Sequence, residues 1–152
     1  MSMRSRAMTL VEVTITIAIL VFVLLGFLRL FIHCSDLAQM SRNLTMAMSN
    51  AQGTLEAMRY YNFDRLVIDY GLGGVPGNTF VLSQLDGSGV IYIDSTDPEA
   101  LIVRIAVSYR SAANHFVGED RDFDGIPAGA EDVNGNGVID SPASLVSIIT
   151  KR

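Results

Sequence analysis

Carboxylate side chains occupy every second position in one stretch near the C-terminal end of the chain. The pattern comprises Asp120, Asp122, Asp124, Gly125 and Glu131. This is the spacing of a twelve-residue calcium-binding loop, in which alternate oxygens wrap one side of a hard cation and the final glutamate closes the other side with two oxygens. The glycine allows a sharp turn, and the backbone carbonyl of Ile126 is expected to supply the seventh position. The stretch therefore predicts a Ca²⁺ site.

A second run of the same kind begins at the next residue and repeats the first half of the pattern. It comprises Asp132, Asn134, Asn136, Gly137 and Asp140. Its twelfth position is Ala143, so the second run lacks the bidentate carboxylate that closes the first. We expect the insertion formed by residues 118–142 to bind one or two Ca²⁺ ions, and the two runs leave the number open.

Two features distinguish this insertion from an EF-hand domain. Pro127 occupies the eighth position of the first run, and no helical pattern flanks either run. The runs instead resemble the isolated Asp/Asn-Gly calcium loops that are inserted in β-rich extracellular proteins. The competing interpretation is a solvated acidic turn region, because Asp, Asn and Gly are also common turn residues.

Acidic charge is concentrated in this insertion. The formal net charge of the 152-residue chain is −5, and seven of its sixteen acidic residues lie between Glu119 and Asp140, where Arg121 is the only basic residue. Seven carboxylates this close would repel one another without a cation. The same charge predicts no contact with nucleic acid.

An apolar segment near the N-terminus is long enough to cross a membrane. Residues 13–28 carry no charge, and extension back to Met8 adds only Glu12. A membrane-spanning helix needs about 20 apolar residues. The segment is too long for the core of a secretory signal peptide, and no small-x-small cleavage site follows it. Because Arg4 and Arg6 precede it, the positive-inside rule places the N-terminus in the cytoplasm and the rest of the chain outside.

The remaining pattern predicts an α+β fold that begins with a long helix. Apolar residues recur at spacings of three and four after the apolar segment, at Leu37, Met40, Leu44, Met48, Ala51, Leu55 and Met58. This stripe predicts an amphipathic helix over 36–60, so that one helix runs from about residue 8 to about residue 60. A connecting loop is expected over 61–78.

Alternating apolar residues predict a small antiparallel β-sheet within residues 79–150. Its expected strands are 79–85, 90–94, 101–110 and 144–150, with a hairpin turn at 86–89. The apolar face of the sheet is expected to pack on the helix stripe. Arg104 and Arg110 fall on the opposite face, where they contact either neighbouring subunits or the acidic insertion.

At the N-terminus, the stretch RSRAMTLVEVTITIAILVFVLLGF resembles the start of type IV prepilins and type II secretion pseudopilins. Such precursors have a short basic leader, a cut before a hydrophobic residue, and Thr-Leu-x-Glu opening a long apolar helix, which correspond here to Met8-Thr9-Leu10-Val11-Glu12. The resemblance implies a leader of residues 1–7, cleavage between Ala7 and Met8 by prepilin peptidase, and methylation of the new amine. The family usually has Gly before the cut, where this chain has Ala7. Within the family, V-type minor pilins and I-type minor pseudopilins are the most similar groups.

The resemblance also accounts for Glu12 in an apolar segment. A carboxylate in lipid costs about 3 kcal/mol unless it is paired. Cleavage after Ala7 would create a positive amine at Met8, and the amine of an incoming subunit can pair with Glu12 of a neighbour during filament assembly.

Together these patterns imply a bacterial inner-membrane precursor that spans the membrane once through residues 8–32. Residues 33–152 would form a globular domain outside, which then joins a type IV pilus or type II secretion filament. The implied partners are prepilin peptidase, other pilin or pseudopilin subunits and the inner membrane. The predicted role is structural rather than enzymatic, because no nucleophile–base or metal–water arrangement is visible. The alternative is an uncleaved, single-span, membrane-anchored calcium-binding module that does not polymerise.

Overall fold

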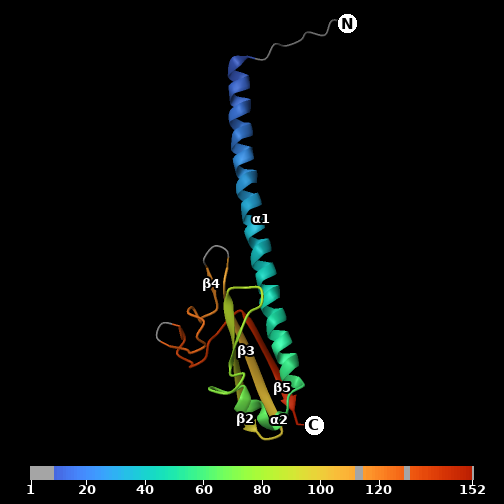
Figure 1. The fold of residues 1–152 in the computed structure, drawn as a ribbon. Helices are drawn as coiled ribbons and strands as arrows, with labels where there is room; N and C mark the ends of the chain where they lie inside the picture. Colours follow the sequence, from blue (N-terminus) through green and yellow to red (C-terminus); the bar gives the residue numbers. More distant parts are fainter. Residues whose placement is uncertain (1–8, 112–114, 129–130, 152) are drawn as a thin grey trace. The chain divides into compact units, whose positions relative to one another are not determined.

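The computed structural model describes residues 9–111, 115–128 and 131–151, and it divides the chain into two compact units, residues 1–39 and 40–152. One α-helix, α1 (Leu10–Arg59), begins in the first unit and ends in the second. Within the described residues, the second unit adds a short helix and five antiparallel strands. The predicted α+β class and the long N-terminal helix are therefore confirmed (Figure 1).

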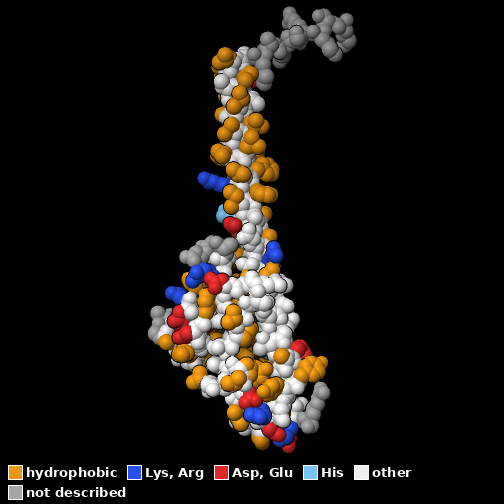
Figure 2. Space-filling model, in the orientation of Figure 1, with side chains coloured by type: hydrophobic (Ala, Val, Ile, Leu, Met, Phe, Trp, Pro, Cys, Tyr) orange, Lys and Arg blue, Asp and Glu red, His pale blue; other side chains and the backbone are white. Residues whose placement is uncertain are grey.

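The helix α1 begins with a capped first turn. The backbone N–H of Glu12 donates to Thr9 Oγ1 at 3.3 Å, and the N–H of Val13 donates to the Thr9 carbonyl. Thr9 thus serves as the N-cap, which satisfies one of the donors that a helix start leaves free. From Thr9 to Gln39 every side chain is exposed, and most are apolar (Figure 2). This part of α1 is long and apolar enough to cross a membrane.

In the second unit, α1 packs against the sheet along one narrow stripe. Its buried residues are Ala47, Ala51, Leu55 and Met58, at spacings of four and three. These residues share a single core cluster with side chains of β2 (Gly87–Asp97), β3 (Ala100–Arg110) and β5 (Ala143–Thr150). The predicted stripe is longer than the buried one, because Leu37, Met40 and Leu44 remain exposed within this chain.

The sheet is antiparallel throughout and is centred on β3. The strand β1 (Thr79–Val81) pairs with β2, which pairs with β3, and β3 also pairs with β4 (Phe116–Val117) and β5. Opposite pairs along β2 and β3 include Ile91 with Ile105 and Tyr92 with Arg104. The predicted strands 101–110 and 144–150 are confirmed within one residue, whereas β4 was not predicted.

Two local predictions were wrong. The hairpin turn expected at 86–89 lies earlier, over residues 82–86, because Gly87, Ser88 and Gly89 already belong to β2 and Phe80 pairs with Gly89. The strand expected over 79–85 therefore ends at Val81, and the strand expected over 90–94 is longer and spans Gly87–Asp97. The loop expected over 61–78 contains a helix, α2 (Phe63–Asp69), whose N-cap Asn62 accepts a hydrogen bond from the Asp64 N–H at 3.0 Å. A seven-residue helix is too short for its periodicity to stand out in the sequence.

The two faces of β3 have different neighbours. Val103, Ile105 and Val107 face α1 and are fully buried. On the other face, Ala106 and Ser108 are also buried, although alternation alone predicts a solvent-facing row. The acidic insertion covers this outer face, which accounts for the burial of both faces at this end of the strand.

Alanine substitutions at two glycines of the second unit should change the free energy of unfolding in opposite directions. Replacement Gly87→Ala would bring a Cβ within 2.3 Å of the Ser108 carbonyl oxygen, whereas Gly53→Ala in α1 meets nothing within 4 Å. We expect Gly87→Ala to lower the free energy of unfolding by about 2 kcal/mol because backbone must move. Gly53→Ala should raise it by about 0.5–1 kcal/mol, because alanine restricts the unfolded chain. Thermal unfolding followed by circular dichroism compares the two, and equal effects would contradict the described packing.

Candidate metal centre

The acidic insertion joins β4 to β5 and lies on the outer face of the sheet. Its two ends are tied together, because the Glu119 N–H donates to the Asp140 carbonyl at 3.0 Å and the Asp140 N–H donates to Glu119 Oε2 at 3.0 Å. Ser88 and Tyr92 of β2 and Arg104 of β3 contact the insertion from below. The insertion is therefore anchored to the sheet at both of its loops.

Four carboxylates of the first loop gather around one point. Asp120, Asp122, Asp124 and Glu131 each offer an oxygen, and these oxygens all lie within 4.8 Å of one another. Glu131 is the twelfth residue of the loop that Asp120 begins, and the loop conformation brings it beside the other three. All four were predicted as ligands, and together they could hold a metal ion.

Hydrogen bonds to the backbone orient these carboxylates. Asp122 Oδ1 accepts from the Asp124 N–H at 3.2 Å, and Asp124 Oδ1 accepts from the Ile126 N–H at 2.7 Å. Glu131 Oε1 accepts from the Arg121 N–H at 2.9 Å. Since each bond uses one oxygen, every one of these carboxylates keeps a second oxygen for a cation.

The backbone of the first loop turns sharply at two positive φ angles. Phe123 has φ 65° and Gly125 has φ 77°. Glycine adopts this region without strain, and at Gly125 a Cβ would also lie 2.3 Å from Thr79 Cγ2. The predicted sharp turn is therefore present, and Gly125 also allows the loop to approach β1 closely.

Asp120 is the most unusual of the four carboxylates because it has no exposed surface. Its Oδ2 accepts from Ser88 Oγ at 2.9 Å and from the Gly125 N–H at 3.2 Å, but its buried Oδ1 has no hydrogen-bond partner among the described residues. Burial raises the pKa of Asp120, while the hydrogen bond from Ser88 and the nearby backbone N–H groups oppose the rise. A buried carboxylate oxygen without a partner is costly, and a bound cation would offset that cost.

The second loop repeats the backbone turns of the first, twelve residues later. Asp132 accepts from the N–H groups of Asn136 and Gly137 at 3.0 and 2.8 Å. Asn134 Oδ1 accepts from the Asn136 N–H, and Asn136 Oδ1 accepts from the Val138 N–H. Gly135 and Gly137 have φ 70° and 74°, which match Phe123 and Gly125.

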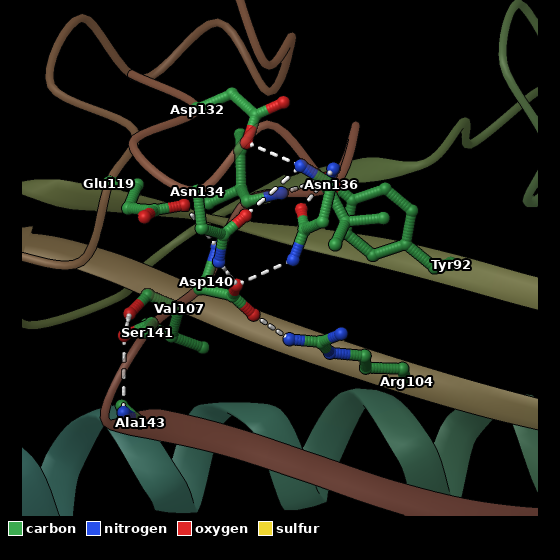
Figure 3. A network of polar contacts seen from close by, with 12 residues as sticks. Tyr92, Arg104, Val107, Glu119, Asp132, Asn134, Asn136, Asp140, Ser141 and Ala143 are labelled. Atoms are coloured by element: carbon green, nitrogen blue, oxygen red, sulfur yellow. Dashed lines mark hydrogen bonds and ion pairs between the residues drawn. The ribbon is translucent and has the colours of Figure 1, made fainter. Parts of the chain in front are cut away.

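Both oxygens of the Asp140 carboxylate, in the second loop, are already bonded to side chains of the protein (Figure 3). Its Oδ2 accepts from Asn134 Nδ2 at 2.7 Å and from Asn136 Nδ2 at 2.8 Å, and its Oδ1 forms an ion pair with Arg104. The two amide hydrogen bonds, together with Arg104, lower the pKa of Asp140. Next to it, the Ile139 N–H donates to the Tyr92 hydroxyl at 2.8 Å, and the Ile139 side chain is fully buried.

The remaining predicted site residues are three at the N-terminal end of the chain and Ile126 within the first loop. Ala7 and Met8 lie outside the described residues. Glu12 is exposed in the first turn of α1, and among the described residues no hydrogen bond or ion pair holds its carboxylate. Ile126, predicted to offer its carbonyl, has a half-exposed side chain.

Sequence reasoning missed two contacts of the insertion. Ser88 and Tyr92 hold Asp120 and Ile139, and alternation along β2 already places both on the same face as Val90. For Arg104, the sequence left open a contact with the acidic insertion, and the structure shows that contact. Arg110 instead lies 3.7 Å from Asp86.

The geometry describes an all-oxygen cluster that suits a hard divalent cation better than a transition metal with nitrogen or sulfur ligands. Comparison of the chain with protein-family models, with curated proteins and with solved structures gives no match.

Proposed function

We propose that this protein is a minor pilin or pseudopilin, a structural subunit of a type IV pilus or a type II secretion filament. The observation that carries the proposal is the helix α1, which is bare and apolar along its first part and buried under an antiparallel sheet along its last part. A helix with this division suits a subunit that moves from lipid into a helical filament core while its sheet is displayed outside.

The first part of α1 exposes its apolar side chains along its whole length. Its apolar side chains, such as Phe22, Phe27 and Phe31, are 66–79% exposed. Exposed apolar area of this extent is unfavourable in water and indicates a membrane or a protein partner. A subunit of this kind uses both in turn, first the inner membrane and then neighbouring α1 helices.

Glu12 is a charged residue in the first turn of the otherwise apolar part of α1. It follows the proposed cut between Ala7 and Met8 by one helical turn. In the filament, its carboxylate would pair with the methylated Met8 amine of an adjacent subunit, which removes the cost of a lone charge in an apolar environment.

We further propose that the first loop binds Ca²⁺ and that calcium stabilises the displayed domain. The four carboxylates, together with the backbone carbonyl that the loop spacing predicts at Ile126, would provide the oxygen-rich, irregular coordination that Ca²⁺ accepts. Mg²⁺ instead demands near-octahedral geometry and keeps several waters. A domain outside the cell would meet calcium at millimolar concentration, where sites of modest affinity are filled.

The N-terminus of the membrane-bound protein tests the proposed class. Intact mass should correspond to a chain that begins at methylated Met8 in cells with prepilin peptidase, and to one that begins at Met1 in cells without it. A matched control is Ala7→Leu, whose bulky side chain should block the cut while residues 13–28 still insert.

The same measurement separates the alternative role. A chain that begins at Met1 in both strains would contradict the filament subunit and favour an uncleaved, membrane-anchored calcium-binding module. Calcium binding by itself does not distinguish the two.

A further inference from the structure

We propose that the second loop binds no metal ion, because Arg104 and the side-chain amides of Asn134 and Asn136 already satisfy the Asp140 carboxylate that would otherwise face a cation. Only the first loop would then hold Ca²⁺, an assignment that rests on the proposed function above. The second loop becomes a metal-free replica that fastens the insertion to the sheet.

Equivalent positions of the two loops carry different side chains, carboxylates in the first loop and amides in the second. At Asp122 and Asp124, one oxygen accepts a backbone N–H and a second carboxylate oxygen remains. At the equivalent Asn134 and Asn136, the one amide oxygen accepts the equivalent backbone N–H, so the remaining group is NH₂. The backbone donors thereby decide the orientation of both amides.

The side-chain NH₂ groups of Asn134 and Asn136 both point at the carboxylate of Asp140. Both NH₂ groups donate to the same oxygen of Asp140, at 2.7 and 2.8 Å. An N–H donor attracts a carboxylate and repels a cation. Where the first loop presents carboxylate oxygens, the second loop therefore presents donors, and its own Asp140 occupies them (Figure 3).

The two loops also differ in whether a basic side chain balances their negative charge. The other oxygen of Asp140 pairs with Arg104, and both side chains of this pair are about two-thirds buried. By contrast, no Lys or Arg side chain forms an ion pair with Asp120, Asp122, Asp124 or Glu131 within the described part of the chain. The first loop thus still requires a positive charge, and the second already has one.

The sheet holds Arg104 in position for this role. Arg104 lies directly opposite Tyr92 in the β2–β3 ladder, and the Tyr92 hydroxyl accepts the N–H of Ile139, the residue before Asp140. Figure 3 shows the second loop and α1 on opposite sides of β3. Two adjacent side chains of the outer face therefore hold two adjacent residues of the loop.

The ion count of the full-length protein in detergent tests the inference. Equilibrium dialysis against millimolar ⁴⁵Ca²⁺ should give one ion per chain for the wild type and still one for Asp132→Asn. The double variant Asn134→Asp with Asn136→Asp restores the counterparts of Asp122 and Asp124 beside Asp132 and Asp140, although Ala143 still stands where the first loop has Glu131, and it should bind two. Two ions in the wild type, reduced to one by Asp132→Asn, would overturn the inference.

A second variant examines Arg104 without reference to calcium. Arg104→Met should lower the unfolding midpoint by about 4 °C or more, and by the same amount in EDTA as in calcium, because the lost partner is a side chain rather than an ion. Arg104→Lys should recover part of the loss. Arg110→Met, on the same strand but with an exposed, longer ion pair to Asp86, is the matched control and should have a smaller effect.

The outcomes separate this inference from the proposed function. An ion count of zero in the wild type would contradict the cation site of the first loop, and the Arg104 variants in EDTA would then decide the inference alone. An unchanged unfolding midpoint for Arg104→Met in EDTA would overturn it.

Discussion

Glu12→Leu is expected to leave the protein cleaved and inserted in the membrane, yet reduce its incorporation into filaments by at least about tenfold. An unpaired carboxylate in lipid costs about 3 kcal/mol, so the pair that removes this cost contributes a comparable drive to assembly. Each 1.4 kcal/mol corresponds to a factor of ten. Quantitative immunoblots of sheared filaments and of membranes measure the ratio.

The conservative variants of Glu12 distinguish charge from shape. Glu12→Gln preserves size and removes the charge, so it should fail as Glu12→Leu does, whereas Glu12→Asp should retain part of the incorporation. Normal incorporation of Glu12→Gln would rule out the proposed pairing with the Met8 amine.

Glu12 also has a local role that needs its own control. The Thr9-x-x-Glu12 spacing is that of a helix capping box, and the Glu12 N–H bonds to Thr9 Oγ1. Thr9→Ala removes this cap at a cost of about 1 kcal/mol but leaves the carboxylate. If Thr9→Ala impaired incorporation as strongly as Glu12→Gln, capping rather than intersubunit pairing would explain the requirement.

Asp120→Asn is expected to weaken calcium binding by about 100-fold or more, since Asp120 is the most buried of the four proposed ligands and calcium affinity follows the number of charged ligands. In calcium, the variant should therefore unfold at a lower temperature than the wild type. Calorimetric titration and thermal unfolding in millimolar calcium provide the two measurements.

In EDTA, Asp120→Asn should raise the unfolding temperature or leave it unchanged. Burial raises the pKa of Asp120, which means that its ionised form is disfavoured in the metal-free fold. The amide of asparagine is uncharged and can still accept from Ser88 or from the Gly125 N–H. Calcium should stabilise the wild type accordingly, by an amount that grows with ligand concentration.

The matched control is Asp94→Asn on the same strand β2. Asp94 lies on the outer face beyond the insertion, and its carboxylate bonds only to Thr96 among the described residues. It should change neither calcium affinity nor the response to EDTA. A loss of stability for Asp120→Asn that is equal in calcium and in EDTA would contradict a cation at Asp120.

Local periodicity was sufficient for the elements that are long or strongly patterned. The unbroken apolar run and its amphipathic continuation predicted α1, and alternation predicted β3 and β5 within one residue. Periodicity could not define the first hairpin, because Gly87, Ser88 and Gly89 read as turn residues. Their place in β2 depends on pairing with β1 and β3, where Phe80 lies opposite Gly89 and a Cβ at Gly87 would meet Ser108.

The sequence by itself determined the apolar helix with Glu12 in its first turn, the α+β class, and the candidate ligands Asp120, Asp122, Asp124 and Glu131, because these depend on residue types at fixed short spacings. Only the tertiary structure decided which groups surround each of the acidic side chains. Asp120 is buried where its loop packs on the distant strand β2, and Ser88 of that strand donates a hydrogen bond to it. Asp140 is paired because the sheet register places Arg104 next to it. Such contacts join residues about 30 or more positions apart in sequence, so burial and charge compensation arise from packing and leave no local pattern to read.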